Sequence, residues 1–161
     1  MSATPDFDPI ALAYANWANR DVADAMAAAT SVMRAQQIVL TTADNALRPL
    51  GLTFARFEAL KLLAFSRGGS LPLGKMGVRL MVHPTSVTNT VDRLEAQGFV
   101  ERQPHPTDRR TTLAAITTEG REVVEKATKV LDDTEYAMSP LTKAEQRQLV
   151  ALITKLRKGS A

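Results

Sequence analysis

The spacing of apolar residues predicts a mostly helical chain. From Ile10 to about Leu47, apolar side chains recur every three or four positions with no proline or glycine between them. This pattern predicts either one long helix, or a short helix near 10–18 followed by a longer one from about Val22. A helix of that length has little of its own chain to lie against, so we expect its apolar stripe to contact another subunit.

Three shorter helices are predicted in the middle of the chain. Thr53 is a good N-cap for a helix over 54–66, and a glycine-containing turn separates it from a helix over 73–80. The third helix starts at Pro84 and runs to about Gln97. The spacing predicts these inward-facing residues: Phe57, Leu60, Leu63, Ala64, Leu73, Met76, Gly77, Leu80, Val87, Val91 and Leu94.

A basic hairpin is expected next. Residues 99–103 and 111–117 are rich in β-branched and aromatic residues, which favours two strands, and the loop between them ends in Arg109 and Arg110. Such a hairpin suits insertion of arginine into a DNA minor groove, where the potential is most negative. Asp108 is expected to pair with a neighbouring arginine and to hold the shape of the loop.

The last part of the chain returns to a helical pattern. Thr117 or Thr118 can cap a helix, residues 139–142 interrupt it, and Thr142 with Glu145 forms a capping box for a final helix with one apolar side. The predicted fold class is therefore mainly α with a small β wing. It comprises a winged helix-turn-helix over 51–117 and dimerisation helices over 10–50 and 118–161.

The predicted helix from Pro84 has an outer face of small hydroxyl residues, an amide and a guanidinium. Small side chains allow close approach to a major groove, and asparagine and arginine offer the paired hydrogen bonds that fit adenine and guanine. An ordinary solvated helix face remains an alternative. The candidate base-contacting residues are Thr85, Ser86, Thr88, Asn89 and Arg93, and the candidate contacts to the DNA backbone are Arg56, Lys75 and His83.

Charge adds modest support for contact with phosphate. Between Thr53 and Thr117 there are nine Lys and Arg residues against five Asp and Glu, a net +4 in a chain whose total is +3. A basic middle between near-neutral ends suits contact with nucleic acid. A bias this small also fits an ordinary solvated surface, so it decides nothing by itself.

Several functional classes are disfavoured by composition. The chain has no cysteine and two histidines, which excludes disulfides and thiol sensing and makes a metal site unexpected. No nucleophile elbow, phosphate-binding glycine loop or catalytic triad is present, so we expect neither an enzyme nor a cofactor. No apolar run approaches the ~18 residues that span a bilayer, and no secretion signal begins the chain, so we expect a cytoplasmic protein without membrane contact.

Two motifs resemble the MarR (multiple antibiotic resistance regulator) family. Residues 108–120, DRRTTLAAITTEG, resemble its wing signature of Asp-x-Arg, apolar residues, Thr and Gly. Residues 86–100, SVTNTVDRLEAQGFV, are similar to its recognition helix and first wing strand. The resemblance covers 51–120 strongly and the terminal helices by pattern only.

This resemblance implies a homodimer that presents two winged helices to a palindromic site on double-stranded DNA. Members are usually repressors that a small, often aromatic or anionic, ligand releases from DNA. That ligand generally binds between the dimer helices and the DNA-binding lobe. A second possibility, from a different class, is an architectural protein that coats duplex DNA with little sequence preference.

The candidates for a ligand pocket come from weaker signals. A urate-responsive branch of the family carries a tryptophan in an added N-terminal helix, which Trp17 resembles. Glu58 stands where that branch has an aspartate, so the correspondence is incomplete. Polar contacts to a ligand could come from Arg34, Gln37 and His83. Each candidate also has a simpler interpretation. Trp17 can be a packing anchor, Arg34 and Gln37 can be solvated polar groups, and His83 can be an N-cap or a phosphate contact. The identity of the ligand does not follow.

Overall fold

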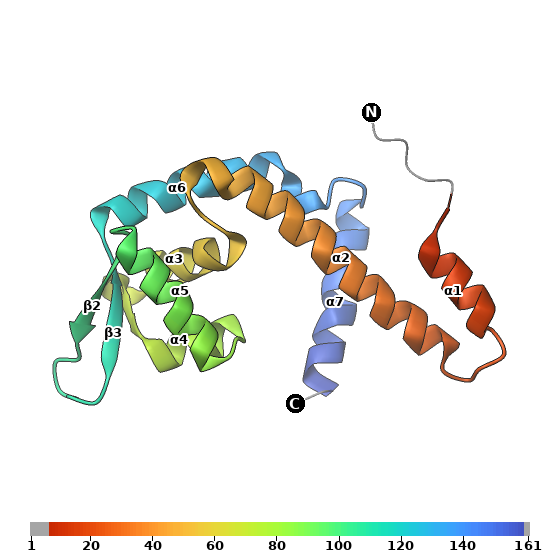
Figure 1. Cartoon of the computed structure of the whole chain (residues 1–161), viewed down its shortest axis with the longest axis horizontal. Coiled ribbons are helices and arrows are strands. Elements are labelled where there is room, and N and C mark those ends of the chain that lie inside the picture. Colours follow the sequence, from red (N-terminus) through yellow and green to blue (C-terminus); the bar gives the residue numbers. More distant parts are fainter. Residues whose placement is uncertain (1–6, 160–161) are drawn as a thin grey trace. The chain divides into compact units, whose positions relative to one another are not determined.

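The structure is a computed structural model that describes residues 7–159 (Figure 1). Its contacts divide the chain into two compact units, Met1–Thr41 and Thr42–Ala161, and each is described by itself. Residues 160–161, the end of the predicted segment 118–161, lie outside the described part.

The first unit contains α1 (Pro9–Trp17) and most of α2 (Ala23–Leu47). A short helix followed by a longer one is therefore the correct alternative. The side chain of Asp8 caps α1 by accepting a hydrogen bond from the Ile10 N–H at 2.9 Å, and the Tyr14 hydroxyl donates to Asp24 at 2.6 Å. Large apolar side chains nevertheless remain exposed on both helices and at Val22 in the turn between them. Those on the helices are Leu12, Tyr14, Trp17, Val32, Met33, Ile38 and Leu40.

The second unit holds the remaining helices. These are α3 (Phe54–Phe65), α4 (Leu73–Leu80), α5 (Pro84–Ala96), α6 (Thr118–Asp133) and α7 (Lys143–Gly159), with short 3-10 turns η1 (Arg48–Leu50), η2 (Arg67–Gly69) and η3 (Glu135–Ala137). The predicted ends of α3, α4 and α5 are confirmed to within about a residue. Helix α6 ends at Asp133, several residues before the predicted interruption at 139–142. The predicted caps form too: Thr53 accepts from the Arg56 N–H at 3.4 Å, and Thr117 accepts from the Gly120 N–H at 3.0 Å.

The wing belongs to a three-stranded antiparallel sheet in the order β1-β3-β2. It consists of β1 (Ser70–Pro72), β2 (Val100–Pro104) and β3 (Thr112–Ile116). Val100 pairs with Ile116 at the base of the hairpin and Pro104 with Thr112 near its tip. The sequence predicted two strands, because three residues of β1 are too short to show an alternating pattern. Pairing of Leu71 with Ala114 forms this third strand.

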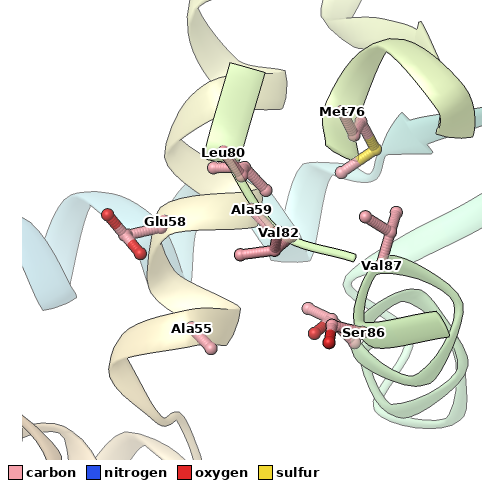
Figure 2. Close-up of a pocket in the computed structure, with 9 residues that line it drawn as sticks. Ala55, Glu58, Ala59, Met76, Leu80, Val82, Ser86 and Val87 are labelled. Carbon is pink, nitrogen blue, oxygen red and sulfur yellow. The ribbon is translucent and has the colours of Figure 1, made fainter. Parts of the chain in front are cut away.

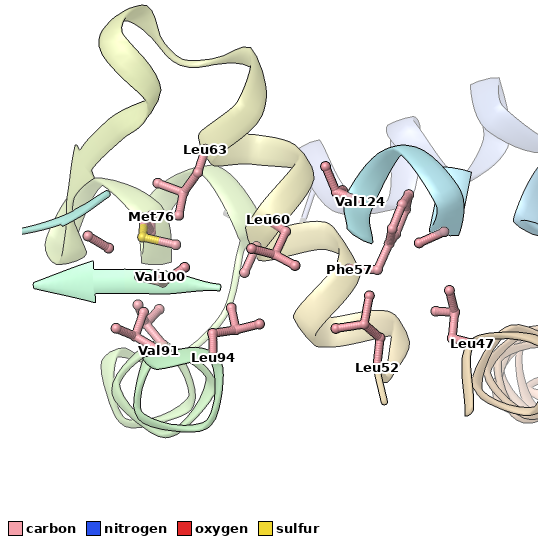
Figure 3. Packing of buried hydrophobic residues seen from close by; sticks show 14 of the residues in the cluster. Leu47, Leu52, Phe57, Leu60, Leu63, Met76, Val91, Leu94, Val100 and Val124 are labelled. Carbon is pink, nitrogen blue, oxygen red and sulfur yellow. The ribbon is translucent and has the colours of Figure 1, made fainter. Parts of the chain in front are cut away.

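The core of this unit holds α5 in place from one side. Figure 3 shows Leu60 and Leu63 of α3 packed with Val91 and Leu94 of α5 and with Val100 of β2. Burying a leucine or valine of this kind stabilises a fold by about 1.5–3 kcal/mol. Of the predicted core, these residues are buried: Phe57, Leu60, Leu63, Met76, Gly77, Val87, Val91 and Leu94. Ala64, Leu73 and Leu80 are half-buried.

Helix α6 closes the base of the wing. The Thr117 hydroxyl donates to the Gly98 carbonyl at 2.7 Å, and the Thr117 N–H donates to the Phe99 carbonyl at 3.0 Å. A Cβ on Gly120 would lie 2.2 Å from that same Phe99 oxygen. Only glycine fits at this contact, which gives a physical reason for the glycine of the wing motif.

The two C-terminal helices differ in burial. Val124, Ala127 and Leu131 of α6 are buried in the same core as α3, so this part of the predicted dimerisation segment also completes the winged helix. Helix α7 has no buried residue in the described chain. Its predicted capping box forms, with Glu145 accepting from the Thr142 N–H at 2.8 Å. No helix within residues 7–159 is long and apolar enough to cross a membrane.

Candidate nucleic-acid interface

Helix α5 is fixed at both ends and along its inner face. His83 caps its start, with Nδ1 accepting a hydrogen bond from the Thr85 N–H at 3.2 Å, and Pro84 occupies the first turn. Gly98 follows its end at φ +77°, a conformation that favours glycine. This leaves the opposite face of α5 available to a partner, and it assigns His83 a definite role as the helix cap.

All the predicted base-contacting residues of α5 are exposed: Thr85, Ser86, Thr88, Asn89 and Arg93. The Thr88 hydroxyl is engaged within the helix, since it donates to the Pro84 carbonyl at 3.2 Å. Asn89 and Arg93 are four residues apart and therefore lie on one face. Their side chains are the groups best suited to hydrogen bonding with base edges.

The wing loop is shaped by a network around Asp108. One carboxylate oxygen accepts from the Arg110 N–H at 2.9 Å and the other accepts from the Thr111 hydroxyl at 2.7 Å. The Thr111 hydroxyl and then the Arg110 N–H lower the pKa of Asp108. The expected arginine side chain is therefore not its partner, because nearby local donors reach the carboxylate. Arg109 and Arg110 remain exposed.

The predicted contacts to the DNA backbone differ in their surroundings. Arg56 donates to the Gly51 carbonyl and to Gln97, both at 3.0 Å, and thereby joins the start of α3 to the end of α5. These contacts favour a structural role for Arg56. Lys75 is exposed on α4.

Arg102 of β2 is a functional candidate that the sequence analysis missed. Its guanidinium forms ion pairs with both Asp92 and Glu95 of α5, and its backbone N–H donates to Glu95 at 3.1 Å. The sequence signal that could have indicated these ion pairs is two acids three residues apart on a helix, followed by an arginine on the next strand. The turn at Gly98 is what brings these elements together, as Figure 1 shows for α5 and β2.

A small cavity of about 60 Å³ lies directly behind α5. Figure 2 shows Ser86 and Val87 of α5 on one side and Glu58 of α3 at the opposite edge. The Glu58 side chain is exposed, but apolar neighbours partly desolvate its carboxylate and raise its pKa. The lining residues are Ala55, Glu58, Ala59, Met76, Leu80, Val82, Ser86, Val87 and Thr90.

The other ligand-pocket candidates have neighbours of their own. In the first unit the Arg20 guanidinium lies 4.4 Å from the centre of the Trp17 ring, and Arg34 donates to Gln37 at 3.4 Å. These contacts fit Trp17 as a packing residue and fit Arg34 and Gln37 as polar groups that pair with each other. No group of three potential metal ligands is found within residues 7–159.

The raised pKa of Glu58 predicts a pH-dependent cost to folding. Between its unfolded and folded pKa values the native state binds more protons, so the free energy of unfolding falls as pH rises through that window. We expect Glu58→Gln to raise Tm at pH 7 and to leave it unchanged below about pH 3, where the carboxyl is almost fully protonated in both states. Thermal melting at both pH values measures this, with exposed Glu122→Gln as the control. Equal shifts at the two pH values would contradict it.

The arrangement of α4, α5 and the β2–β3 hairpin defines a winged helix-turn-helix protein. The sequence model of the MarR family matches residues 52–112. The chain is 34% identical over 110 residues to YkoM, an HTH-type transcriptional regulator of Bacillus subtilis, and the match covers 65% of this chain and 68% of that protein. It is also 34% identical over 76 residues to the regulator ML2140 of Mycobacterium leprae, covering 47% of this chain and 52% of that one. The chain thus spans about half the length of some curated relatives that it matches.

Solved structures agree with the sequence comparison. Sco5413, a MarR family transcriptional regulator from Streptomyces coelicolor, is 51% identical with a TM-score of 0.79, and the match covers 85% of this chain and 95% of that one. Sco3205, another MarR family regulator of that organism solved in complex with DNA, has a TM-score of 0.76 at 24% identity, covering 82% and 88% of the two chains. The chain belongs to the MarR family, whose members are transcriptional regulators and not enzymes.

Proposed function

We propose that the chain is a homodimeric repressor that binds a palindromic DNA operator and is released from it by a small ligand. The observation that carries this proposal is the exposed face of α5 beside an arginine-tipped wing. Asn89 and Arg93 would enter a major groove, and Arg109 and Arg110 an adjacent minor groove. The Sco3205 complex with DNA supports this use of the fold.

The dimer is supported by apolar surface that a single chain leaves in water. Four large side chains on α7 are exposed, namely Leu149, Val150, Leu152 and Leu156, and α1 and α2 expose others. Covering such surface contributes about 25 cal/mol per Å² of apolar area, from which the entropy cost of bringing two chains together is subtracted. Two-fold symmetry would then present two α5 helices to half-sites about one helical turn apart, roughly 10 bp.

We place the ligand at the cavity behind α5, whose lining residues would have to move apart, because about 60 Å³ is less than the roughly 300–1,000 Å³ of most ligand pockets. A ligand that binds one position of α5 better than another would shift the distance between the two recognition helices and weaken the fit to DNA. In BpsR of Bordetella bronchiseptica, which shares this fold, DNA binding is regulated by 6-hydroxynicotinic acid. We propose Glu58 and Ser86 as the polar groups that an effector would meet at this cavity.

Sequence preference separates this proposal from an architectural DNA coat. We expect the wild-type chain to prefer a duplex from its own upstream region over a random duplex of equal length. Asn89→Ala should lower affinity for the upstream duplex by roughly 10- to 100-fold, equivalent to ~1–3 kcal/mol for a paired base contact. It should leave affinity for the random duplex nearly unchanged, because phosphate contacts persist.

Fluorescence anisotropy at a fixed salt concentration measures both affinities. Asn16→Ala on exposed α1 is the matched control and should behave like the wild type. Arg109→Ala with Arg110→Ala should weaken binding to either duplex. Equal affinity of the wild type for the two duplexes would favour the architectural alternative and refute sequence-specific binding.

A further inference from the structure

We propose that Arg102 neutralises the two acids of α5, Asp92 and Glu95, and thereby lets this side of the helix approach DNA. We call these three residues the charge clamp. This inference rests on the proposed DNA binding and assigns a role to a residue outside the base-contacting face. Residues three apart are neighbours on a helix surface. Asp92 is therefore next to Asn89, the proposed base-contacting residue, and Glu95 is next to Asp92.

The geometry of the clamp joins two elements. One guanidinium nitrogen of Arg102 contacts Glu95 and the other contacts Asp92, while the backbone N–H of Arg102 holds the second oxygen of Glu95. The Arg102 side chain is 27% exposed, against 54% for Asp92 and 41% for Glu95. The planar fork of arginine suits this double contact, which a lysine would make less well.

The charges of Arg102, Asp92 and Glu95 affect DNA binding more than folding. Exposed ion pairs contribute little to stability, and the helix is already anchored by Val87, Val91 and Leu94. Two unpaired carboxylates beside a phosphate backbone would oppose binding, and that repulsion weakens as salt screens it. Removing the Arg102 charge should therefore lower DNA affinity. The loss should be smaller at high salt and should require the carboxylates of Asp92 and Glu95.

Three variants separate this role from others. Arg102→Met should weaken binding to promoter and random duplexes by on the order of 10-fold at low salt, with a smaller effect at high salt. Asp92→Asn with Glu95→Gln should bind at least as tightly as the wild type. The triple variant, which combines all three changes, should recover the affinity lost in Arg102→Met, because no uncompensated carboxylate remains.

The triple variant decides between the explanations. If Arg102 contacts phosphate itself, or only fastens the wing to α5, the triple variant will bind as weakly as Arg102→Met, and the clamp is overturned. Lys61→Met is the matched control: it removes one ion-paired cation between α3 and α6 and should leave DNA affinity near the wild-type value. Thermal melting confirms that each variant is folded. Failure of the wild type to bind any duplex would instead overturn the proposed function, and the clamp with it.

Discussion

Gly120→Ala is expected to lower the free energy of unfolding by at least about 3 kcal/mol, the upper part of the range for inserting a methyl group into a packed site. The added Cβ would lie 2.2 Å from the Phe99 carbonyl oxygen and 2.9 Å from Ile116 Cγ1. A backbone oxygen cannot rotate away as a side chain can. Either α6 or the start of β2 must move, and the hydrogen bond from the Thr117 N–H to that oxygen would be lost.

Thermal and urea unfolding of the purified variant measure this cost. In a chain of this size the loss corresponds to a fall in Tm of at least about 6 °C. Gly74→Ala in α4 is the matched control, because no atom lies within 4 Å of its added Cβ. That substitution should be neutral or stabilise the helix by up to ~1 kcal/mol. A Gly120→Ala variant that melts within about 2 °C of the wild type would refute the close contact at the base of the wing.

Leu152→Asp is expected to convert the proposed dimer to a monomer and to reduce operator affinity by on the order of 100-fold or more. Leu152 is 59% exposed on the apolar side of α7. A carboxylate there would have to be buried without a partner when two chains associate, which is costly. A monomer presents one recognition helix and loses the gain in affinity that comes from binding two half-sites together.

Light scattering and an operator titration test the two halves of this prediction. Ala151→Asp introduces the same charge at an exposed position on the other side of α7 and should remain dimeric. If Leu152→Asp stays dimeric with wild-type affinity, α7 does not contribute this face to the interface. A monomeric wild-type chain would contradict the proposed dimer itself.

Local signals were enough to predict most of the secondary structure. Helix starts were predicted from capping residues at Thr53 and Thr142 and from a proline in the first turn at Pro84. The spacing of apolar residues predicted the core faces of α3 and α5. These features depend on neighbours a few residues away. Strand β1 could not be predicted in this way, because Leu71 becomes part of a strand only by pairing with Ala114, far along the chain.

The candidate site was predicted less completely, for the same reason. The exposed face of α5 followed from periodicity, but the clamp at Arg102 needs α5 and β2 side by side. Asp108 was assigned the wrong partner, because charge alone did not reveal the local donors at Arg110 and Thr111. The contacts of Arg56 with Gly51 and Gln97 likewise depend on how α3 meets the end of α5.

A footprint of the purified wild-type chain on the DNA upstream of its own gene tests sequence-specific dimeric binding most directly. At moderate salt we expect one protected palindrome, with half-sites about one helical turn, or roughly 10 bp, apart. Protection should disappear when one half-site is scrambled, because both recognition helices must be engaged. Uniform protection along the fragment, or none at a protein concentration that binds random duplex, would contradict the proposed operator-binding dimer.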